Sequence, residues 1–168
     1  MNGVIIYKSK YGSTEQYARW LGNETGLPVY SVKHVASSAI RGSGLVVLAS
    51  NIRIGKLTLA GWIRKHWPML KARKLVILSV SAAPGSDPSV KEAWVRSLPQ
   101  EVRAASTHFA LQGRLIFDGL DLLDKLLMSV ASKMQGDPAV AENLRKGIDG
   151  VDKAQLQPVV EHIRTLTA

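Results

Sequence analysis

The chain alternates short apolar runs with longer segments in which apolar residues recur at helical spacing. The apolar runs, rich in β-branched and aliphatic residues, cover Gly3–Tyr7, Val29–Val32, Leu45–Ala49, Leu75–Val80 and Thr107–Leu111. Runs of this length predict buried strands. The stretches "LVVLAS" and "LVILSV" have few polar alternate positions, which is typical of strands covered on both faces. We therefore expect five buried strands.

Segments with helical periodicity lie between and after these runs, at about 14–25, 34–41, 57–70, 89–105 and 152–166, the 34–41 segment being the shortest and weakest. Strands that alternate with helices favour a parallel sheet with helices on both of its faces. The expected fold class is therefore α/β, with three layers. At 168 residues and 46% hydrophobic residues, the chain is expected to form one domain over 1–168.

A further apolar segment follows the fifth predicted strand, within an expected insertion at about 114–150. One stripe of a helix would hold Leu120, Leu123, Leu127, Val130 and Met134, and Leu122 and Leu126 widen it. This helix could pack on the sheet or on a second subunit in a homodimer. It could also line a hydrophobic substrate site, or rest on a membrane with help from Arg114, Lys125 and Lys133.

Acidic residues near the start of this segment have two interpretations. Asp118 can cap the helix, and Asp121 and Asp124 lie on one side of it, near the positive end of the helix dipole. The same three residues could be taken for a metal cluster, but the pairing with the dipole is the favoured interpretation. The four histidines show no metal-ligand spacing.

Composition limits the chemistry and the compartment. The chain has no cysteine, which excludes disulfides, thiolate metal sites and a cysteine nucleophile, so that redox chemistry must come from a cofactor. No apolar run is long enough to span a bilayer and no cleavable leader is evident, so a cytoplasmic location is expected. The net charge of +9 favours anionic partners without choosing among them.

The stretch Ser9–Thr14 lies where the first predicted strand turns into a helix. Its hydroxyls, its glycine and the free amides at the start of the helix could form an anion site, and an ordinary Ser/Thr helix cap is the alternative. A P-loop is excluded because Gly55-Lys56 is followed by Leu57 and has no upstream glycine at the required distance. Gly42-Ser43-Gly44 precedes a strand and does not fit a dinucleotide fingerprint.

Four stretches together resemble one family. Ser9-x-Tyr11-Gly12-Ser13-Thr14-Glu15 resembles the phosphate loop of flavodoxins, which binds the terminal phosphate of FMN. The stretch "ASNIRIGK" resembles the corresponding loop of the flavodoxin-like protoporphyrinogen oxidases that use menaquinone, and "LQGRLIFDGLDLLDKLLMSVASKM" is similar to that family's Gly-Arg strand end and long apolar insertion. The stretch "SVSAAPGSDPSVKEAW" lies in the position of the other flavin loop. The resemblance implies a flavodoxin-like three-layer sandwich, with strand order 2-1-3-4-5 and a long apolar helical insertion after strand 5. The implied cofactor is FMN.

The resemblance also implies where FMN binds. The positions in three loops are Ser9, Lys10, Tyr11, Gly12, Ser13 and Thr14; Ser50, Asn51, Ile52, Arg53, Ile54 and Gly55; and Ser81, Ala82, Ala83, Pro84 and Gly85. The first loop would hold the phosphate, with Lys10 adding a positive charge. Arg53 would stabilise the anionic reduced flavin, unless it is a solvated surface arginine. No residue is nominated as a general base.

Two features favour an enzyme over an electron carrier. The loop 81–87 lacks the tyrosine or tryptophan that covers the flavin in many carrier flavodoxins, and those carriers are typically acidic. By resemblance, electrons would pass from a porphyrinogen-like substrate through FMN to a quinone, in heme biosynthesis, with possible peripheral contact at the inner face of the cell membrane. A non-catalytic electron carrier is the alternative. No motif for reading nucleic acid is present.

Overall fold

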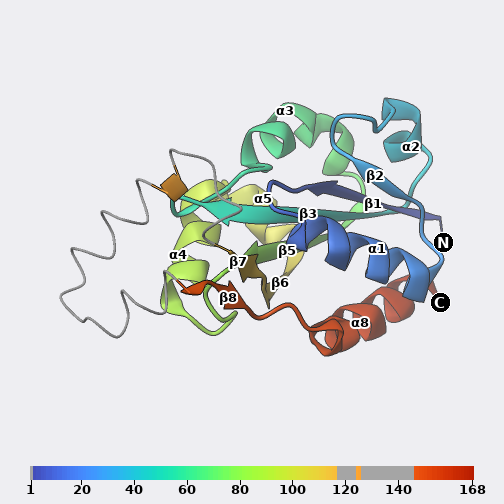
Figure 1. The fold of residues 1–168 in the computed structure, drawn as a ribbon. Helices are drawn as coiled ribbons and strands as arrows, with labels where there is room; N and C mark the ends of the chain where they lie inside the picture. The colour runs from blue at the N-terminus through green and yellow to red at the C-terminus, as the bar shows by residue number, and fades with distance from the viewer. Residues whose placement is uncertain (1, 117–123, 126–145) are drawn as a thin grey trace.

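The computed structural model describes residues 2–116, 124–125 and 146–168. A parallel sheet forms its centre, with strand order β2-β1-β3-β5-β6 (Figure 1). The strands are β1 (Gly3–Lys8), β2 (Val29–Ser31), β3 (Leu45–Arg53), β5 (Lys74–Ser81) and β6 (Ser106–Gln112). When the five parallel strands alone are numbered in chain order, leaving out β4, this order becomes 2-1-3-4-5, as the resemblance implied. The α/β prediction and the five predicted strands are confirmed.

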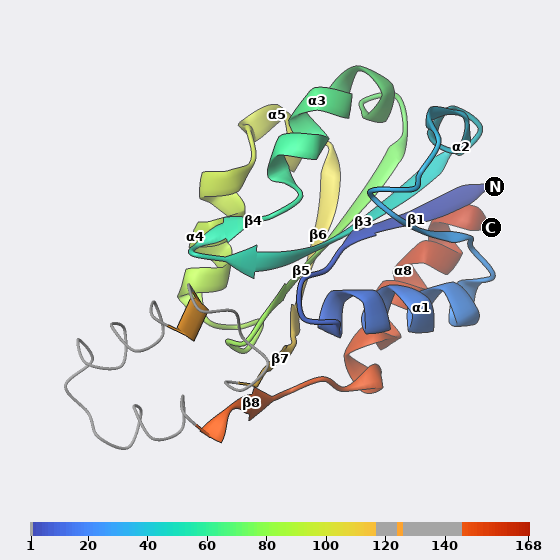
Figure 2. The same ribbon diagram turned by 45° about the horizontal axis from the view of Figure 1, so that its top comes forward.

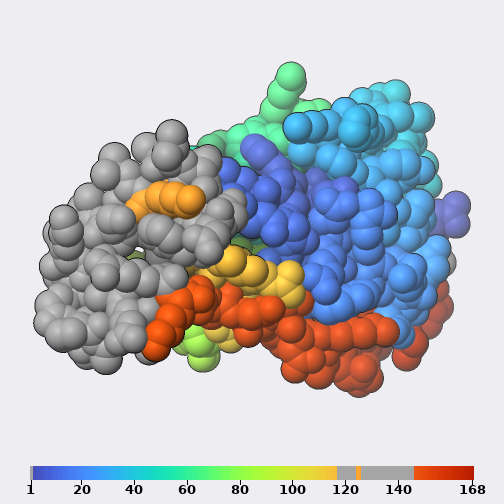
Figure 3. Space-filling view, viewed as in Figure 1, coloured from blue at the N-terminus to red at the C-terminus, as the bar shows by residue number. Residues whose placement is uncertain are grey.

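Helices cover both faces of the sheet, as predicted. One face carries α1 (Ser13–Thr25) and the C-terminal α8 (Gln157–Thr167), and the other carries α2 (Ser37–Arg41), α3 (Ala60–Leu70), α4 (Pro88–Ser97) and α5 (Gln100–Ala104) (Figure 2). Figure 3 shows α1 in blue beside α8 in red. Alternate residues of each strand enter the two cores: Leu45 and Val47 pack toward α1 and α8, whereas Val46 and Leu48 pack toward α3.

The parallel register brings the ends of the strands to one edge. Lys8 of β1 pairs with Ser50 of β3, Asn51 of β3 pairs with Val80 of β5, and the end of β5 pairs with the end of β6. The loops that follow these strands therefore emerge side by side. In an open α/β sheet this carboxyl edge is where ligands bind.

Two predicted helices differ from the observed ones. The helix predicted over 57–70 begins at Ala60, because Lys56 and Leu57 form a short strand, β4 (Lys56–Leu57), antiparallel to the end of β3. The helix predicted over 89–105 is two helices, α4 and α5. Leu98 is extended (φ −123°, ψ 138°), as expected for a residue before a proline, and Pro99 interrupts the helix.

The helix predicted over 14–25 is confirmed as α1, and the two remaining helical segments are shorter than predicted or divided. The 34–41 segment contains only α2, and the 152–166 segment starts with a 3-10 helix, η2 (Lys153–Leu156), that leads into α8. Within the expected insertion, β7 (Arg114–Leu115) pairs antiparallel with β8 (Ile148–Asp149). The predicted Leu-rich helix lies outside the described residues except for 124–125. No helix in the described parts of the chain is long and apolar enough to cross a membrane.

Candidate functional site

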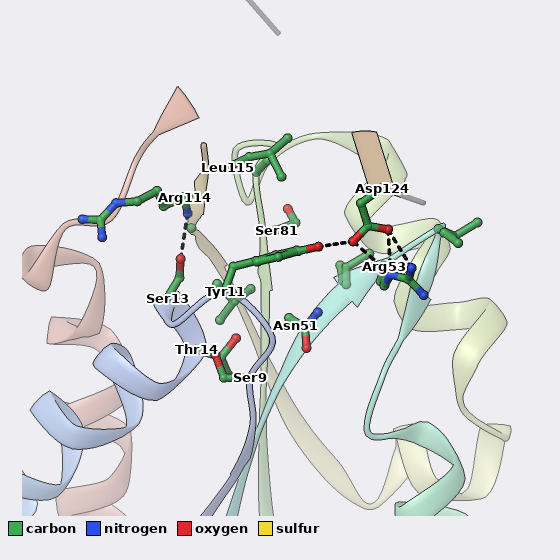
Figure 4. A pocket seen from close by; sticks show the side chains of 15 residues that line it. Ser9, Tyr11, Ser13, Thr14, Asn51, Arg53, Ser81, Arg114, Leu115 and Asp124 are labelled. Carbon is green, nitrogen blue, oxygen red and sulfur yellow. Dashed lines mark hydrogen bonds and ion pairs between the residues drawn. The ribbon is translucent and has the colours of Figure 1, made fainter. Parts of the chain in front are cut away.

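A cavity of about 420 Å³ opens at the carboxyl edge of the sheet (Figure 4). Its wall is formed by the loop after β1, the end of β3, the end of β5 and the β6–β7 connection. The lining residues are Ser9, Tyr11, Ser13, Thr14, Asn51, Ile52, Arg53, Ile54, Val80, Ser81, Ala82, Gly113, Arg114, Leu115 and Asp124. Hydroxyl groups gather on the α1 side, and aliphatic side chains form much of the remaining wall.

The 9–14 loop leads into α1 through Gly12. Gly12 has φ 90° and is the N-cap of α1, and in the described part of the chain no side chain caps this helix end. The Gly12 amide donates to Ser9 Oγ at 3.1 Å, so this hydroxyl folds the loop. The amides of the first turn have no acceptor within the helix, and the helix dipole adds positive potential there. The Ser/Thr helix cap considered as an alternative is therefore not what forms, and the geometry of an anion site remains.

Two hydroxyls fix the first turns of α1 against the rest of the molecule. Ser13 Oγ accepts a hydrogen bond from the Arg114 amide at 3.0 Å. The Tyr17 hydroxyl donates to the Gln112 carbonyl at 2.6 Å and accepts from the Asp152 amide and from Gln155 Nε2. Burial raises the pKa of Tyr17, so the phenol stays protonated and able to donate. The start of α1 is thereby tied to the end of β6 and to the segment before α8.

The β3–β4 connection is a two-residue hairpin with unusual backbone angles. Ile54 has φ 52° and Gly55 has φ 64°, and both values are required by a type I′ turn. Among the described residues, Ile54 is the one non-glycine residue with positive φ. Its side chain is 66% exposed and reaches the cavity. Thr58 Oγ1 donates to Asn51 Oδ1 at 2.7 Å. This hydrogen bond fixes the side chain of Asn51, which also lines the cavity.

Asp124 joins two of the loops that form the site. Its carboxylate accepts from Arg53 Nε at 2.9 Å and Nη2 at 2.7 Å, and from the Tyr11 hydroxyl (Figure 4). It also accepts from Lys10 Nζ at 2.6 Å. The Arg53 guanidinium, helped by Lys10 and Tyr11, holds the pKa of this carboxyl far below its usual range, against the opposing effect of desolvation. Asp124 is therefore a buried anion in contact with two cations, and the helix-dipole interpretation of this residue was incomplete.

The connection after β5 is pinned to the end of β6. The Gly113 amide donates to the Ser81 carbonyl at 2.6 Å, and Gln112 Nε2 donates to the Ala82 carbonyl at 3.1 Å. A Cβ on Gly85 would lie 2.6 Å from the Ala110 carbonyl oxygen, so only glycine fits there. This loop is held close to the sheet, and Ser81 and Ala82 contribute to the wall.

The structure brings together ten of the predicted cofactor-binding residues on the cavity wall: Ser9, Tyr11, Ser13, Thr14, Asn51, Ile52, Arg53, Ile54, Ser81 and Ala82. The other predicted residues do not line it: Lys10, Gly12, Ser50, Gly55, Ala83, Pro84 and Gly85. Ser50 is fully buried on the α3 side of the sheet, where its Oγ accepts a hydrogen bond from the Leu59 amide at 3.0 Å. Gly12 and Gly55 instead shape the loops that carry the wall.

Five residues of the wall were not among those predicted: Val80, Gly113, Arg114, Leu115 and Asp124. All five lie within stretches that the resemblance had singled out, Val80 in "SVSAAPGSDPSVKEAW" and the other four in "LQGRLIFDGLDLLDKLLMSVASKM", so the sequence held a signal for their loops but not for these positions. In the described residues, no cluster of histidine and acidic side chains is placed to hold a metal ion.

The residues present fit FMN. A cavity of about 420 Å³ lies within the range of roughly 300 to 1,000 Å³ that is usual for small-molecule sites. The uncapped first turn of α1 and the hydroxyls of Ser13 and Thr14 suit a phosphate. The aliphatic wall, which includes Ile52 and Val80, suits a flat apolar ring system.

This chain is similar to known proteins both in its sequence family and in its fold. A protein-family model described as a flavodoxin domain matches residues 4–142. A flavodoxin, WrbA-like protein from Agrobacterium tumefaciens has a similar structure, with TM-score 0.53 and 12% identity over 67% of this chain and 83% of that one. A flavodoxin from the domain Archaea has TM-score 0.49 and 15% identity over 80% of this chain and 99% of that one.

An FMN-dependent NADH-azoreductase from Bacillus anthracis str. Ames Ancestor, in complex with FMN, has TM-score 0.43 and 9% identity, over 80% of this chain and 99% of that one. No curated protein sequence matches this chain. The family model covers most of the chain, and the order of the parallel strands is the flavodoxin-like one. The chain therefore belongs to the flavodoxin domain family, whose cofactor is FMN.

Proposed function

We propose that this protein is an FMN-dependent oxidoreductase that passes electrons from a reduced organic substrate through FMN to a quinone. The observation that carries the FMN assignment is the uncapped first turn of α1, which opens beside the 9–14 loop onto an apolar cavity. Protoporphyrinogen is the substrate that the sequence resemblance puts first, and menaquinone is the corresponding acceptor. Peripheral contact with the membrane would bring the protein to a quinone held in the bilayer.

Each part of the wall has a task in this proposal. When bound, FMN supplies the redox chemistry by accepting two electrons and a proton from the substrate and passing them on. The 9–14 loop and the amides of α1 hold its phosphate. The ends of β3 and β5 provide backbone groups and aliphatic side chains for its ring system, and Arg53 supplies a positive charge near the ring.

The wall and the surface charge support an enzyme. The loop after β5 offers no aromatic side chain to cover a flavin face, and its described contacts hold it against β6. Ile54 adds an exposed aliphatic side chain to the rim, which suits a bulky apolar substrate. The net charge of +9 has the opposite sign to that of typical acidic carriers.

The FMN assignment is tested by titrating the purified protein with FMN and following flavin absorbance and fluorescence. Saturable quenching with a 1:1 end point is expected. Gly12→Ala should weaken binding, since a side chain at φ 90° strains the loop that holds the phosphate. Gly26→Ala is the matched control, because Gly26 has φ 71° at the other end of α1. Absence of quenching in the wild-type protein would refute the assignment.

The substrate is tested separately, with FMN-loaded protein, protoporphyrinogen and menaquinone under anaerobic conditions. Porphyrin should appear with about three menaquinones consumed for each porphyrin formed, because the porphyrinogen gives up six electrons and each quinone accepts two. The reaction should be faster than with free FMN at the same concentration. A rate no greater than that of free FMN rejects the substrate and leaves the cofactor in place.

A non-catalytic electron carrier is the second candidate, because the matching family model is that of the flavodoxin domain itself. Such a carrier would exchange electrons with a protein partner and would show no turnover of small molecules. Rapid reduction of the FMN-loaded protein by a ferredoxin-type protein, with no activity toward porphyrinogen or quinone, would establish it.

A further inference from the structure

Two cations from different loops of the site meet at one protein carboxylate. Lys10 comes from the loop after β1 and Arg53 from the end of β3, and both form ion pairs with Asp124, at 2.6 and 2.7 Å. The contact with Arg53 involves both Nε and Nη2 of the guanidinium. The Tyr11 hydroxyl donates to the same carboxylate. We call these four residues the Asp124 cluster.

The Asp124 cluster is part of the cavity wall. Asp124, Tyr11 and Arg53 all line the cavity, and the side chain of Asp124 is only 11% exposed, against 31% for both Lys10 and Arg53. Water therefore screens this carboxylate poorly, and its charge acts at close range on anything bound in the cavity. The cluster contributes two positive charges and one negative charge.

We propose that Asp124 sets the charge of the flavin pocket: by pairing with Lys10 and Arg53 it limits how strongly these two cations stabilise negative charge on FMN. The inference rests on the proposed function, since it concerns FMN bound in this cavity. Asp124 acts through its fixed charge, both by pairing with the two cations and directly across the cavity, and it has no role as acid or base.

The redox consequence follows from charge balance. On reduction, FMN takes up two electrons and one proton from the substrate and so gains one negative charge. A buried carboxylate in the same wall opposes this gain, and the two cations favour it. Asp124 therefore lowers the midpoint potential of bound FMN relative to a pocket with Lys10 and Arg53 alone.

The decisive variant is Asp124→Asn, which keeps the size of the side chain and one oxygen acceptor while removing the charge. We expect the Kd for oxidised FMN to fall and the reduced cofactor to gain about tenfold more affinity than the oxidised one. For a two-electron couple, this ratio is a shift of about 30 mV toward positive potential. The measurements are an FMN titration and a spectroelectrochemical titration of the loaded protein.

Glu24→Gln is the matched control. Glu24 pairs with Lys153 at 2.6 Å, the same length as the Lys10–Asp124 pair, and neither residue lines the flavin cavity. The substitution changes the net charge of the protein by the same amount as Asp124→Asn. It should leave the Kd for FMN and the potential at their wild-type values. Equal shifts in both variants would overturn the proposal, because they would show a general charge effect.

Lys10→Met tests the same idea in the opposite direction and does not depend on the folding of the Asn variant. Removal of one cation should raise the Kd for FMN and move the potential to more negative values. An unchanged potential in this variant, or an unchanged or more negative one in Asp124→Asn, overturns the inference. If wild-type protein fails to bind FMN, the proposed function falls and the inference with it. If it binds FMN normally, only the inference is at stake.

Discussion

Ile54 shows how a single residue can be held in a costly conformation at a site. A β-branched residue at φ 52° is strained, at a cost of the order of 1 to 3 kcal/mol, and the type I′ hairpin requires such an angle. Asparagine adopts this region far more readily. Ile54→Asn should therefore raise the free energy of unfolding by about 1 kcal/mol, measured by urea denaturation.

Ile52→Asn is the control for Ile54→Asn, because Ile52 lies in the extended part of the same strand and packs against the core on the α3 side. It should destabilise the protein. If Ile54→Asn also destabilises, the strain at Ile54 is not the dominant energy at this position. If FMN-loaded Ile54→Asn also binds the substrate more weakly, the aliphatic side chain of Ile54 contributes to substrate binding at the rim of the cavity. This contribution would explain why a strained isoleucine occupies the position.

The sequence located the loops of the site better than the direction of their side chains. Ser50 was assigned to the cofactor from the loop in which it stands, but strand alternation turns it toward Leu59 on the far face of the sheet. Asp124 lies 114 positions from Lys10 and 71 from Arg53, and no local pattern encodes a pairing at that distance. Such contacts depend on where the tertiary fold brings the segments together.

At the scale of elements, Tyr17 connects three parts of the chain that hold the site in place. Its hydroxyl bonds the Gln112 carbonyl, the Asp152 amide and Gln155 Nε2, and its ring is fully buried in the core beneath α1. Tyr17→Phe should lower the free energy of unfolding by about 2 to 3 kcal/mol, because polar partners lose their hydrogen bonds in a buried setting. Chemical denaturation measures the change.

Tyr30→Phe is the matched control for Tyr17→Phe, since Tyr30 lies on the edge strand β2 with 37% of its surface exposed. It should change the free energy of unfolding by less than about 0.5 kcal/mol. A Tyr17→Phe variant as stable as this control would show that the link between α1, β6 and the segment before α8 contributes little.

The elements themselves were largely predictable, since the three central strands β1, β3 and β5 each contain a nearly continuous apolar run. The misses have local physical causes. A proline disfavours the interior of a helix, so Pro99 by itself indicates a break. The apolar periodicity across 89–105 nevertheless predicted one continuous helix. Leu57 satisfies helical spacing in the sequence, but Lys56 and Leu57 pair with Arg53 and Ile52 once the 53–56 hairpin forms. Pairing of this kind overrides local periodicity.

At the scale of the whole molecule, His108 makes stability depend on pH. Its ring stacks on Trp94 at 4.2 Å and bonds Ser79 Oγ at 2.8 Å, and burial lowers its pKa from 6.5 to about 4. Between these values the unfolded chain binds a proton that the folded chain does not. The free energy of unfolding should therefore fall as pH drops from about 6.5 to 4, by up to about 3 kcal/mol from this group.

Urea denaturation at several pH values measures this dependence. The double variant Ser79→Ala/His108→Phe keeps the stacked ring, leaves no hydroxyl without its partner, and should flatten the slope between pH 4 and 6.5. His34→Gln, at an exposed position, should retain it. An unchanged slope in the double variant would assign the pH dependence to other groups.

The charge of the whole molecule leads to a prediction about how the cofactor arrives. A net charge of +9 creates a positive potential that attracts a phosphate dianion before any contact is made. Salt shortens the range of this attraction, from a Debye length of about 30 Å at 0.01 M to about 3 Å at 1 M. The association rate of FMN, followed by stopped-flow fluorescence, should therefore fall about tenfold over this range. Riboflavin, which has the same ring system without the phosphate, is the control and should associate at a rate nearly independent of salt. Equal salt dependence for the two flavins would mean that the surface charge does not steer the phosphate, and that the excess of lysine and arginine serves another partner.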